Sequence, residues 1–407
     1  MTGLKKGLDK MNNKIKAIAI ITILITTIIT GCSKDKITPT NTDISIDSNT
    51  NEHTTDIDNK EEDNANADKE EINEEDDEKT PPTEPVEEEV VEEENHDNEA
   101  INNLTGLWIS KEAAERRPVG VMINNLKKAI PQSGIVQADI IYETLVEGGI
   151  TRLFAIFRDF DAEKIGPVRS ARHYYLDFAF DHDSIYSHYG RSVYAKEKFR
   201  TWNSPNLEGL LTNYETIMTF QDSTRRRPHS TYTSFDRLIK AWKFVGYRET
   251  PKEGFESKLK FADEEVNLDT ELEATLVKLP YSDAYKQLNA YLEYNDEDKQ
   301  YYRFQYGSKH IDRETGEQLK FNNIIIQFTS IWNIKGDPNG CLDMSLVSSG
   351  NGYYITNGKA EKITWKKTSH YKPTLYYNEN GEEIKLNKGK TFISVFPKHR
   401  KSKITFE

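Results

Sequence analysis

Two different patterns of apolar and polar residues succeed one another along this chain of 407 residues. Between residues 104 and 250, apolar runs of strand length alternate with stretches of helical periodicity. From residue 274 onward, short strand-like runs follow one another, separated by turn residues. We therefore predict an α/β domain with a mixed sheet at 104–250 and a smaller β-rich domain at 274–407, with a polar linker or excursion at 251–273.

Within the first domain, the pattern predicts three strands and three helices. The strands are expected at 119–123, 153–157 and 185–189. The first helix is expected from about 134 to 146, because its apolar positions recur at i, i+3, i+4 and i+7, and Gly148 and Gly149 would end it. Ser170 is expected to cap a second helix over 171–180, and Ser234 a third over 235–245 that ends at Gly246.

The C-terminal part contains six runs of strand type, and loops such as NENG and NKG lie between them. The runs cover 301–306, 323–328, 352–355, 363–366, 374–377 and 391–395. Their short spacing predicts a compact antiparallel arrangement.

The N-terminus has the pattern of a secretory signal peptide over residues 1–31. Five lysines precede the apolar run 17–29, which would extend only about 20 Å as a helix, whereas an apolar bilayer core is about 30 Å thick. The run ends in Ile29-Thr30-Gly31-Cys32, which resembles the lipobox of bacterial lipoproteins. That resemblance implies cleavage before Cys32, diacylation of its sulfur by fatty acids such as palmitate, and anchoring at the outer face of the cytoplasmic membrane. The alternative is an uncleaved anchor helix.

Residues 32–103 are strongly acidic. The part from 33 to 103 carries 26 acidic side chains and 5 lysines and almost no aromatic residues. Such a segment buries too little apolar area to offset its chain entropy, so we expect a disordered linker. Cation binding by the Glu87–Glu94 cluster is the sharper alternative, but the cluster lacks the fixed oxygen geometry of a calcium site.

Charge and motifs exclude several classes of function. Residues 104–407 have a surplus of only four positive charges, so no nucleic-acid partner is expected. Apart from Cys32 the chain has one cysteine, Cys341, so no internal disulfide is expected. No phosphate-binding loop, HExxH or CxxC motif occurs, and we expect neither a cofactor nor a metal.

Several motifs resemble one known family. They are QADIIYETLVEGGITRLFAIF, IGPVRSAR and RRRPHSTYTS in the first domain, and ITWKK with YYNENGEEIKLNKGKTFISVFP in the second. They resemble the YerB-like lipoproteins of Gram-positive bacteria, and the likeness covers nearly all of 104–403. It implies a lipid-anchored protein of two domains, whose function in that family is undescribed, and it supplies no catalytic residue.

Polar residues gather at the predicted joints between strands and helices. Three acids, Asp139, Glu143 and Glu147, would line one stripe of the first predicted helix. Seven cationic or titratable residues follow at predicted element ends: Arg152, Arg169, Arg172, His188, Arg191, Arg227 and His229. In α/β sheets, ligands bind where strands lead into helix N-termini.

Three interpretations of these residues remain open. The first is a convergent Arg/His cluster that binds an anionic wall component or an envelope partner protein, since Arg binds two oxygens at once. The second is internal pairing of Glu143 or Glu147 with Arg152, Arg169 or Arg172, with Asp139 on the same stripe. The third is a hydrolase or transferase acting on wall polymer, with His188 or His229 as general base. No complete catalytic set is visible, so the catalytic residues stay unknown.

Overall fold

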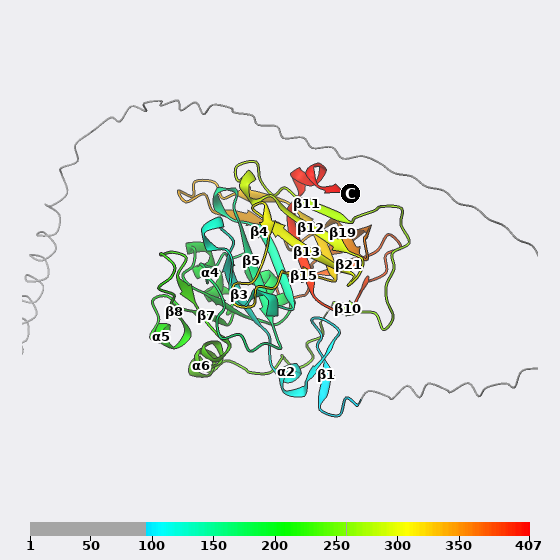
Figure 1. The fold of residues 1–407 in the computed structure, drawn as a ribbon. Coiled ribbons are helices and arrows are strands. Elements are labelled where there is room, and N and C mark those ends of the chain that lie inside the picture. The colour runs from blue at the N-terminus through cyan, green and yellow to red at the C-terminus, as the bar shows by residue number, and fades with distance from the viewer. Residues whose placement is uncertain (1–94, 258) are drawn as a thin grey trace, which may run out of the picture. The chain divides into compact units, whose positions relative to one another are not determined.

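The structure is a computed structural model that describes residues 95–257 and 259–407 (Figure 1). The predicted signal peptide, the proposed lipidation site Cys32 and most of the predicted acidic linker lie outside the described residues. A short hairpin comes first, in which β1 (Glu99–Ile101) pairs with β2 (Trp108–Ser110). A strand therefore forms at 99–101, inside the range predicted as a disordered linker, because β2 supplies a partner strand and the ring of His96 stacks on Trp108 at 3.9 Å.

A mixed sheet of ten strands forms the centre of the described part. In spatial order its strands are β21 (Leu375–Tyr377), β20 (Lys359–Lys366), β19 (Ser349–Thr356), β16 (Asn323–Thr329), β23 (Thr391–Pro397), β4 (Ile140–Leu145), β5 (Thr151–Phe157), β3 (Val119–Asn124), β6 (Ile185–His188) and β7 (Asn206–Glu208). Half of them come from each of the two predicted domains. The mixed character of the sheet is confirmed, because parallel and antiparallel pairs both occur in it.

The strand β23 joins the two halves of this sheet. It pairs in parallel with β16 on one side and with β4 on the other, and all of its residues are buried. All six predicted C-terminal strands are present, but the purely antiparallel arrangement is wrong at β23. A strand between two parallel neighbours is covered at both edges, here by β16 of the C-terminal half and by β4 of the N-terminal half.

A second, antiparallel sheet is built entirely from the C-terminal half. Its path is β14 (Ser308–Lys309), β13 (Gln300–Gln305), β12 (Ala290–Asn295), β11 (Leu276–Leu279) and β24 (Thr405–Phe406), with β15 (Lys320–Phe321) beside β13. Apolar side chains of both sheets belong to one core. Ring contacts between Phe321 and Phe392 at 5.3 Å, and between Tyr281 and Phe396 at 5.2 Å, join them.

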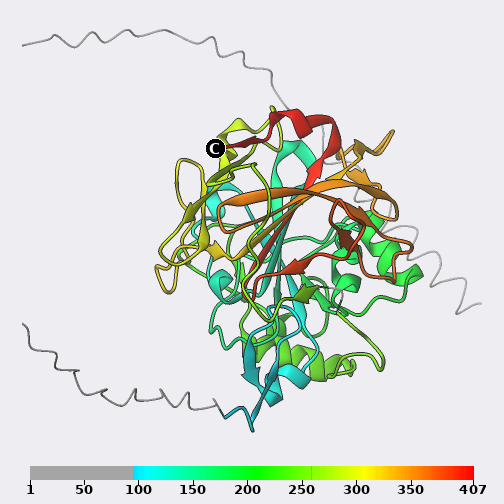
Figure 2. The same cartoon turned by 90° about the vertical axis from the view of Figure 1, so that its right-hand side faces the viewer.

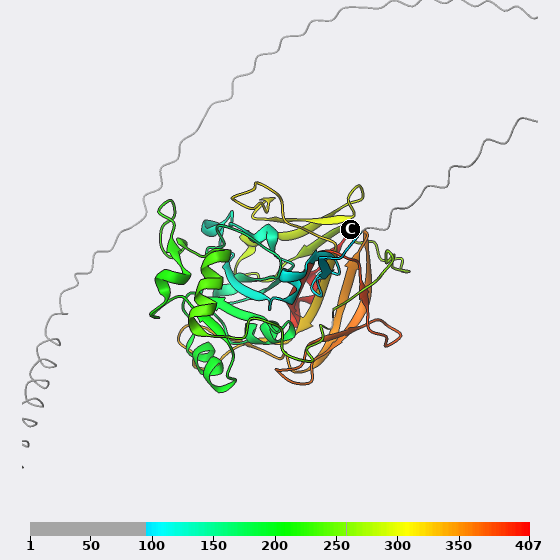
Figure 3. The same cartoon turned by 90° about the horizontal axis from the view of Figure 1, so that it is seen from below.

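Helices are few, so the description as α/β holds only loosely. They are α2 (Lys111–Glu115), α3 (Tyr175–Asp181), α4 (Val193–Thr201), α5 (Glu215–Met218) and α6 (Phe235–Val245). Figures 1 and 3 show α4, α5 and α6 gathered at the end of the molecule built by the N-terminal half. Figure 2 shows the chain ending beside the red η5 segment (Lys398–Lys403).

The remaining short elements lie in the connections. Three two-stranded pairs complete the strands: β8 (Phe220–Gln221) with β9 (Thr231–Tyr232), β10 (Lys260–Phe261) with β22 (Lys385–Leu386), and β17 (Ile331–Asn333) with β18 (Leu342–Met344). Single 3-10 turns occur at η1 (Lys127–Ala129), η2 (Ile135–Gln137), η3 (Glu147–Gly149) and η4 (Lys286–Leu288).

The third predicted helix is confirmed in its bounds and its caps. The Ser234 hydroxyl accepts a hydrogen bond from the backbone N–H of Arg237 at 3.3 Å, and Gly246 ends α6 with φ +70°. These are the side-chain cap and the left-handed terminus that such residues favour.

The first predicted helix is wrong. Residues 140–145 form β4, with every residue buried. A strand covered on both faces has a continuous apolar run, and such a run also satisfies the i, i+3, i+4 pattern of a helix. The stripe of three acids therefore does not exist: Asp139 precedes β4, Glu143 lies within it and Glu147 begins η3.

The second predicted helix starts later than expected. It is α3, which begins at Tyr175, so Ser170 is no N-cap. The hydroxyl of Ser170 instead donates to the carbonyl oxygen of Tyr189 at 3.1 Å. Arg169 and Arg172 therefore lie in an irregular connection, which removes the helix N-terminus from the predicted anion site.

One buried ion pair bridges the two sheets. Glu143 on β4 and Arg303 on β13 are fully buried, with Nη2 of the arginine 2.7 Å from Oε2 of the glutamate. The other carboxylate oxygen accepts from Asn125 at 3.0 Å and from Thr151 at 2.6 Å. Arg303 also contacts His310, whose ring is 2.7 Å from the side-chain oxygen of Gln132. Each partner of the ion pair thus has further partners that offset its loss of hydration.

We expect Glu143→Gln to lower the free energy of unfolding by about 3–5 kcal/mol, because it leaves Arg303 charged and buried without a carboxylate. The double variant Glu143→Gln/Arg303→Met should regain most of that loss. As a control, Lys299→Gln breaks an exposed pair with Glu265 and should cost about 1 kcal/mol or less. Urea unfolding measures all three, and equal losses in the single variant and the control would contradict the bridging role.

Candidate functional site

Five of the seven predicted cationic residues fall into two separate groups in the structure. Arg152, Arg169 and Arg172 surround the carboxylate of Glu147, and we call these three the arginine cluster. His188 and Arg191 instead lie around Glu208 on β7. No pattern in the sequence indicated Glu208 as a shared partner, so its role was missed.

Within the arginine cluster, only Arg172 has a carboxylate as a hydrogen-bond partner. Its Nε and Nη2 atoms lie 2.5 and 2.7 Å from the two oxygens of Glu147, a bidentate pair. Arg152 is 5% exposed and donates to the carbonyl oxygen of Ser170. The Nε atom of Arg169 is buried and has no hydrogen-bond partner among residues 95–257 and 259–407. Three guanidinium groups therefore share one carboxylate.

The pKa values of the cluster reflect this excess of positive charge. Burial, together with the charges of Arg172 and Arg169, lowers the pKa of Arg152 to about 10. Burial and Arg172 also lower the pKa of Arg169. For Arg172, burial alone would lower the pKa, but the hydrogen bonds of Glu147 overcome it and raise the value. An added anion would relieve the repulsion within the cluster.

Further positive charge lies next to the arginine cluster. Burial and then the charges of Arg169, Lys128 and Arg225 lower the pKa of His229. The guanidinium of Arg225 hydrogen-bonds to backbone carbonyl oxygens, those of Lys128, Ile130 and Pro131. Carbonyl oxygens satisfy its donors but leave its charge uncompensated, so the positive region extends beyond the cluster.

His229 and Arg227 lie outside the cluster itself. Nδ1 of the His229 ring is 2.8 Å from the side-chain nitrogen of Asn124, so the amide donates to the ring. Arg227 is exposed. Burial and Glu215 raise the pKa of Tyr189 to about 12, and the charge of Arg227 opposes that rise. Within residues 95–257 and 259–407, neither side chain hydrogen-bonds to a serine, threonine or cysteine that could act as a nucleophile.

His188 is sealed inside the protein. Its side chain has no exposed area, its two ring nitrogens lie 2.9 Å from the carbonyl oxygen of Gly190 and 3.1 Å from Asn206, and its ring stacks on Phe199 at 4.9 Å. Arg191 pairs with Glu208. A base in this position has no path to a substrate, so the geometry gives His188 a packing role.

Asp139 does not join the arginines either. Its two oxygens accept from the side chain of Asn102 at 2.9 Å and from the backbone N–H of Arg158 at 2.7 Å. Burial raises the pKa of Asp139 to about 7 against these hydrogen bonds. With Glu143 bound to Arg303, only Glu147 of the three predicted acids reaches the arginine cluster.

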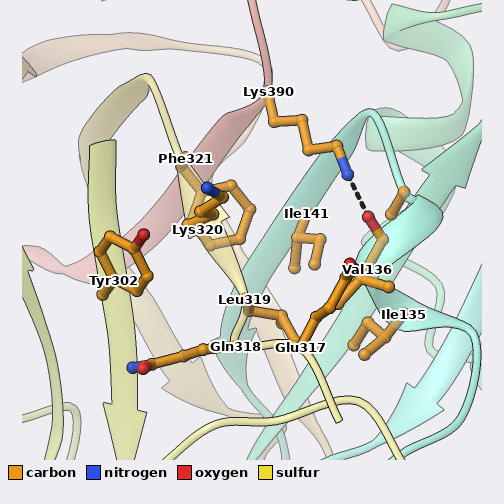
Figure 4. Close-up of a pocket in the computed structure, with 11 residues that line it drawn as sticks. Ile135, Val136, Ile141, Tyr302, Glu317, Gln318, Leu319, Lys320, Phe321 and Lys390 are labelled. Atoms are coloured by element: carbon orange, nitrogen blue, oxygen red, sulfur yellow. Dashed lines mark hydrogen bonds between the residues drawn. The ribbon is translucent and has the colours of Figure 1, made fainter. Parts of the chain in front are cut away.

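The hollow drawn in Figure 4 has a volume of about 300 Å³ and an apolar floor. Ile135 and Ile141 line it from one side, and Leu319 and Phe321 from the other. The ammonium group of Lys390 at its edge donates to the carbonyl oxygen of Val136. None of the predicted cationic residues lines this hollow, so it is distinct from the arginine cluster.

Metal sites and membrane-spanning helices are both absent from the described residues. No group of three or more His, Cys, Asp or Glu side chains within residues 95–257 and 259–407 is placed to hold a metal ion. In those same ranges, no helix is long and apolar enough to cross a membrane. Cys341 is buried and forms no disulfide in this part of the chain.

The fold and the cluster together define a protein of two sequence segments that share one mixed sheet, with an arginine-rich site in the first segment. A family model described as "Protein of unknown function (DUF3048) N-terminal domain" matches residues 104–248, and its C-terminal counterpart matches 277–393. The chain belongs to this DUF3048 family.

Relatives confirm the resemblance seen in the sequence motifs. The chain is 34% identical over 300 residues to "Putative lipoprotein YerB" of Bacillus subtilis (strain 168), covering 72% of this chain and 85% of the relative. The crystal structure of YerB from Bacillus subtilis matches with a TM-score of 0.62 and 32% identity, over 72% of this chain and 96% of that one.

The raised pKa of Asp139 predicts a pH dependence of stability. The folded-state pKa of about 7 lies above the unfolded value of 3.8, so the folded state binds the proton more tightly. The stability that this proton contributes is lost as pH rises through 7. The free energy of unfolding should therefore fall more between about pH 5 and about pH 8 in the wild type than in Asp139→Asn. Asp159→Asn, at an exposed position, is the control. An unchanged pH profile in Asp139→Asn would refute the assignment.

Proposed function

We propose that this protein is a cell-envelope lipoprotein, anchored through Cys32 at the outer face of the cytoplasmic membrane, that binds an anionic wall component or a partner protein through the arginine cluster. The anchoring part is supported by the sequence Ile29-Thr30-Gly31-Cys32 and the preceding apolar run, and by the name of the Bacillus subtilis relative. Two acyl chains hold a protein stably on a membrane where one does not.

The observation that carries the binding function is the ratio of three guanidinium groups to one carboxylate. Arg152 is held below the surface, while Arg169 and Arg172 are partly exposed and accessible to a ligand. A phosphate or carboxylate group accepts several N–H donors and relieves the mutual repulsion of these side chains. Arg225 and Lys128 add positive potential beside it, which attracts a polyanion at longer range.

Arg169 is the most direct position for a binding test. The Nε atom of its guanidinium makes no hydrogen bond with residues 95–257 and 259–407, and Arg169→Gln removes the charge while keeping a polar side chain. We expect this variant to bind a soluble poly(glycerol phosphate) about tenfold more weakly than the wild type at low salt. Calorimetry on the full chain measures it.

The control for this test is Arg200→Gln on α4, which removes the same charge from an exposed position and should bind as the wild type does. Equal loss in both variants would mean unspecific attraction, and absence of wild-type binding to the polymer would count against anion recognition. If the wild type breaks down wall material and the Arg169→Gln variant does so equally well, the result would favour an enzyme instead.

The anchoring proposal has its own test. Cys32→Ser removes the thiol that accepts the acyl chain, so we expect the protein to leave the membrane fraction for the soluble or secreted fraction of cells that express it. Cys341→Ser is the matched control, because it removes the other cysteine. Membrane retention of the Cys32→Ser protein would contradict lipid anchoring and support an uncleaved helix.

A further inference from the structure

A second hollow, of about 580 Å³, lies between α4 and the β17–β18 hairpin. It has the volume of small-molecule sites, which typically measure about 300–1,000 Å³. Both halves of the chain line it, and the lining includes four aromatic residues, two histidines and three carboxylates. We call it the aromatic hollow and define it by Tyr194, Trp202, Trp332, His173, His370 and Asp343.

Trp332 offers a free ring to this hollow. It lies on β17 and is 46% exposed, and it makes no ring stacking or cation–π contact within residues 95–257 and 259–407. Trp202, by contrast, is held between His370 at 4.0 Å and the ammonium of Lys198 at 5.1 Å. An exposed indole exposes apolar area that a ligand with an apolar face would cover.

His173 positions a carboxylate in the lining of this hollow. The residue is 6% exposed, and its Nδ1 has no hydrogen-bond partner in the part of the chain that the structure describes. Its Nε2 lies 3.0 Å from Oδ1 of Asp343, which also accepts from the backbone N–H of Met344 at 2.8 Å. Because Nδ1 of His173 is itself buried, the group that a ligand hydroxyl can reach is the carboxylate of Asp343, which is 41% exposed and accepts from such a donor.

The opposite side of the hollow is fixed in place. Nδ1 of His370 lies 2.9 and 3.1 Å from the two oxygens of Asp177 on α3. Asp177 is 2% exposed and also lies 3.9 Å from the ammonium of Lys367. These contacts hold the imidazole ring against Trp202 before any ligand arrives, which reduces the entropy lost on binding.

The charges of the hollow argue against an anionic ligand. Its lining includes the carboxylates of Asp177, Glu197 and Asp343 against the ammonium groups of Lys198 and Lys335. Anions have a better site at the arginine cluster, where one carboxylate meets three guanidinium groups. The aromatic hollow instead combines a flat apolar ring with hydrogen-bonding groups at its edge.

We propose that the aromatic hollow binds an uncharged saccharide chain. One sugar ring stacks its C–H face on the indole of Trp332, because polarised C–H groups are attracted to the negative face of an aromatic ring. Its hydroxyl groups hydrogen-bond to the carboxylate of Asp343. This site does not depend on the arginine cluster, and the two fail independently.

The test is titration of the full-length protein with two neutral probes, tetra-N-acetylchitotetraose and maltotetraose, by calorimetry and tryptophan fluorescence. Binding of either probe is expected, and the comparison shows whether the acetamido group matters. Trp332→Ala should weaken binding about tenfold or more, whereas Trp332→Phe should keep most of the affinity and lose the fluorescence change.

Two controls separate this site from general effects. Phe244→Ala removes another exposed aromatic ring, on α6, and Arg169→Gln alters the arginine cluster; both should bind the saccharide as the wild type does. Asp343→Asn, which keeps the side-chain shape, should weaken binding even if Trp332→Ala does not fold. Absence of wild-type binding to both probes, or unchanged affinity in Trp332→Ala and Asp343→Asn, would overturn the proposal.

Discussion

The buried ion pair between Glu143 and Arg303 is the interaction on which the rest of the structure depends. It joins β4 of the ten-stranded sheet to β13 of the antiparallel sheet, so it links residues 160 positions apart in the sequence. Both groups have lost their hydration, and each is stable only because the other and a set of amide, hydroxyl and imidazole partners replace it. The two sheets therefore share a polar centre as well as an apolar core.

This pairing also determines the charge of the candidate site. Glu143 is held by Arg303 and Glu208 is held by Arg191, so neither compensates the arginine cluster. Glu147 alone remains for Arg152, Arg169 and Arg172. The positive surplus of the cluster is thus a consequence of where the other carboxylates are bound, and it is this surplus that favours an anionic ligand.

The elements predicted correctly are those whose pattern of apolar and polar residues fits only one kind of secondary structure. The strand β13 alternates buried and half-buried residues, and α6 carries both caps, so both were found. The strand β4 was mistaken for a helix because it is buried on both faces, and only its neighbours β5 and β23 reveal it. The alternation of β13 placed Arg303 on the same face as Tyr301, which was the available indication that it is buried, but no local pattern identifies Glu143 as its partner.

Anion binding at the arginine cluster requires that Arg169 and Arg172 receive an anion while buried arginines do not. Resolved nitrogen resonances of the arginine side chains, followed while inorganic phosphate is added to the full-length protein, distinguish these residues. We expect saturable shifts for Arg169 and Arg172 and none for Arg303, which is fully buried in its pair. Shifts of equal size at all exposed arginines, or none at Arg169 and Arg172, would contradict it.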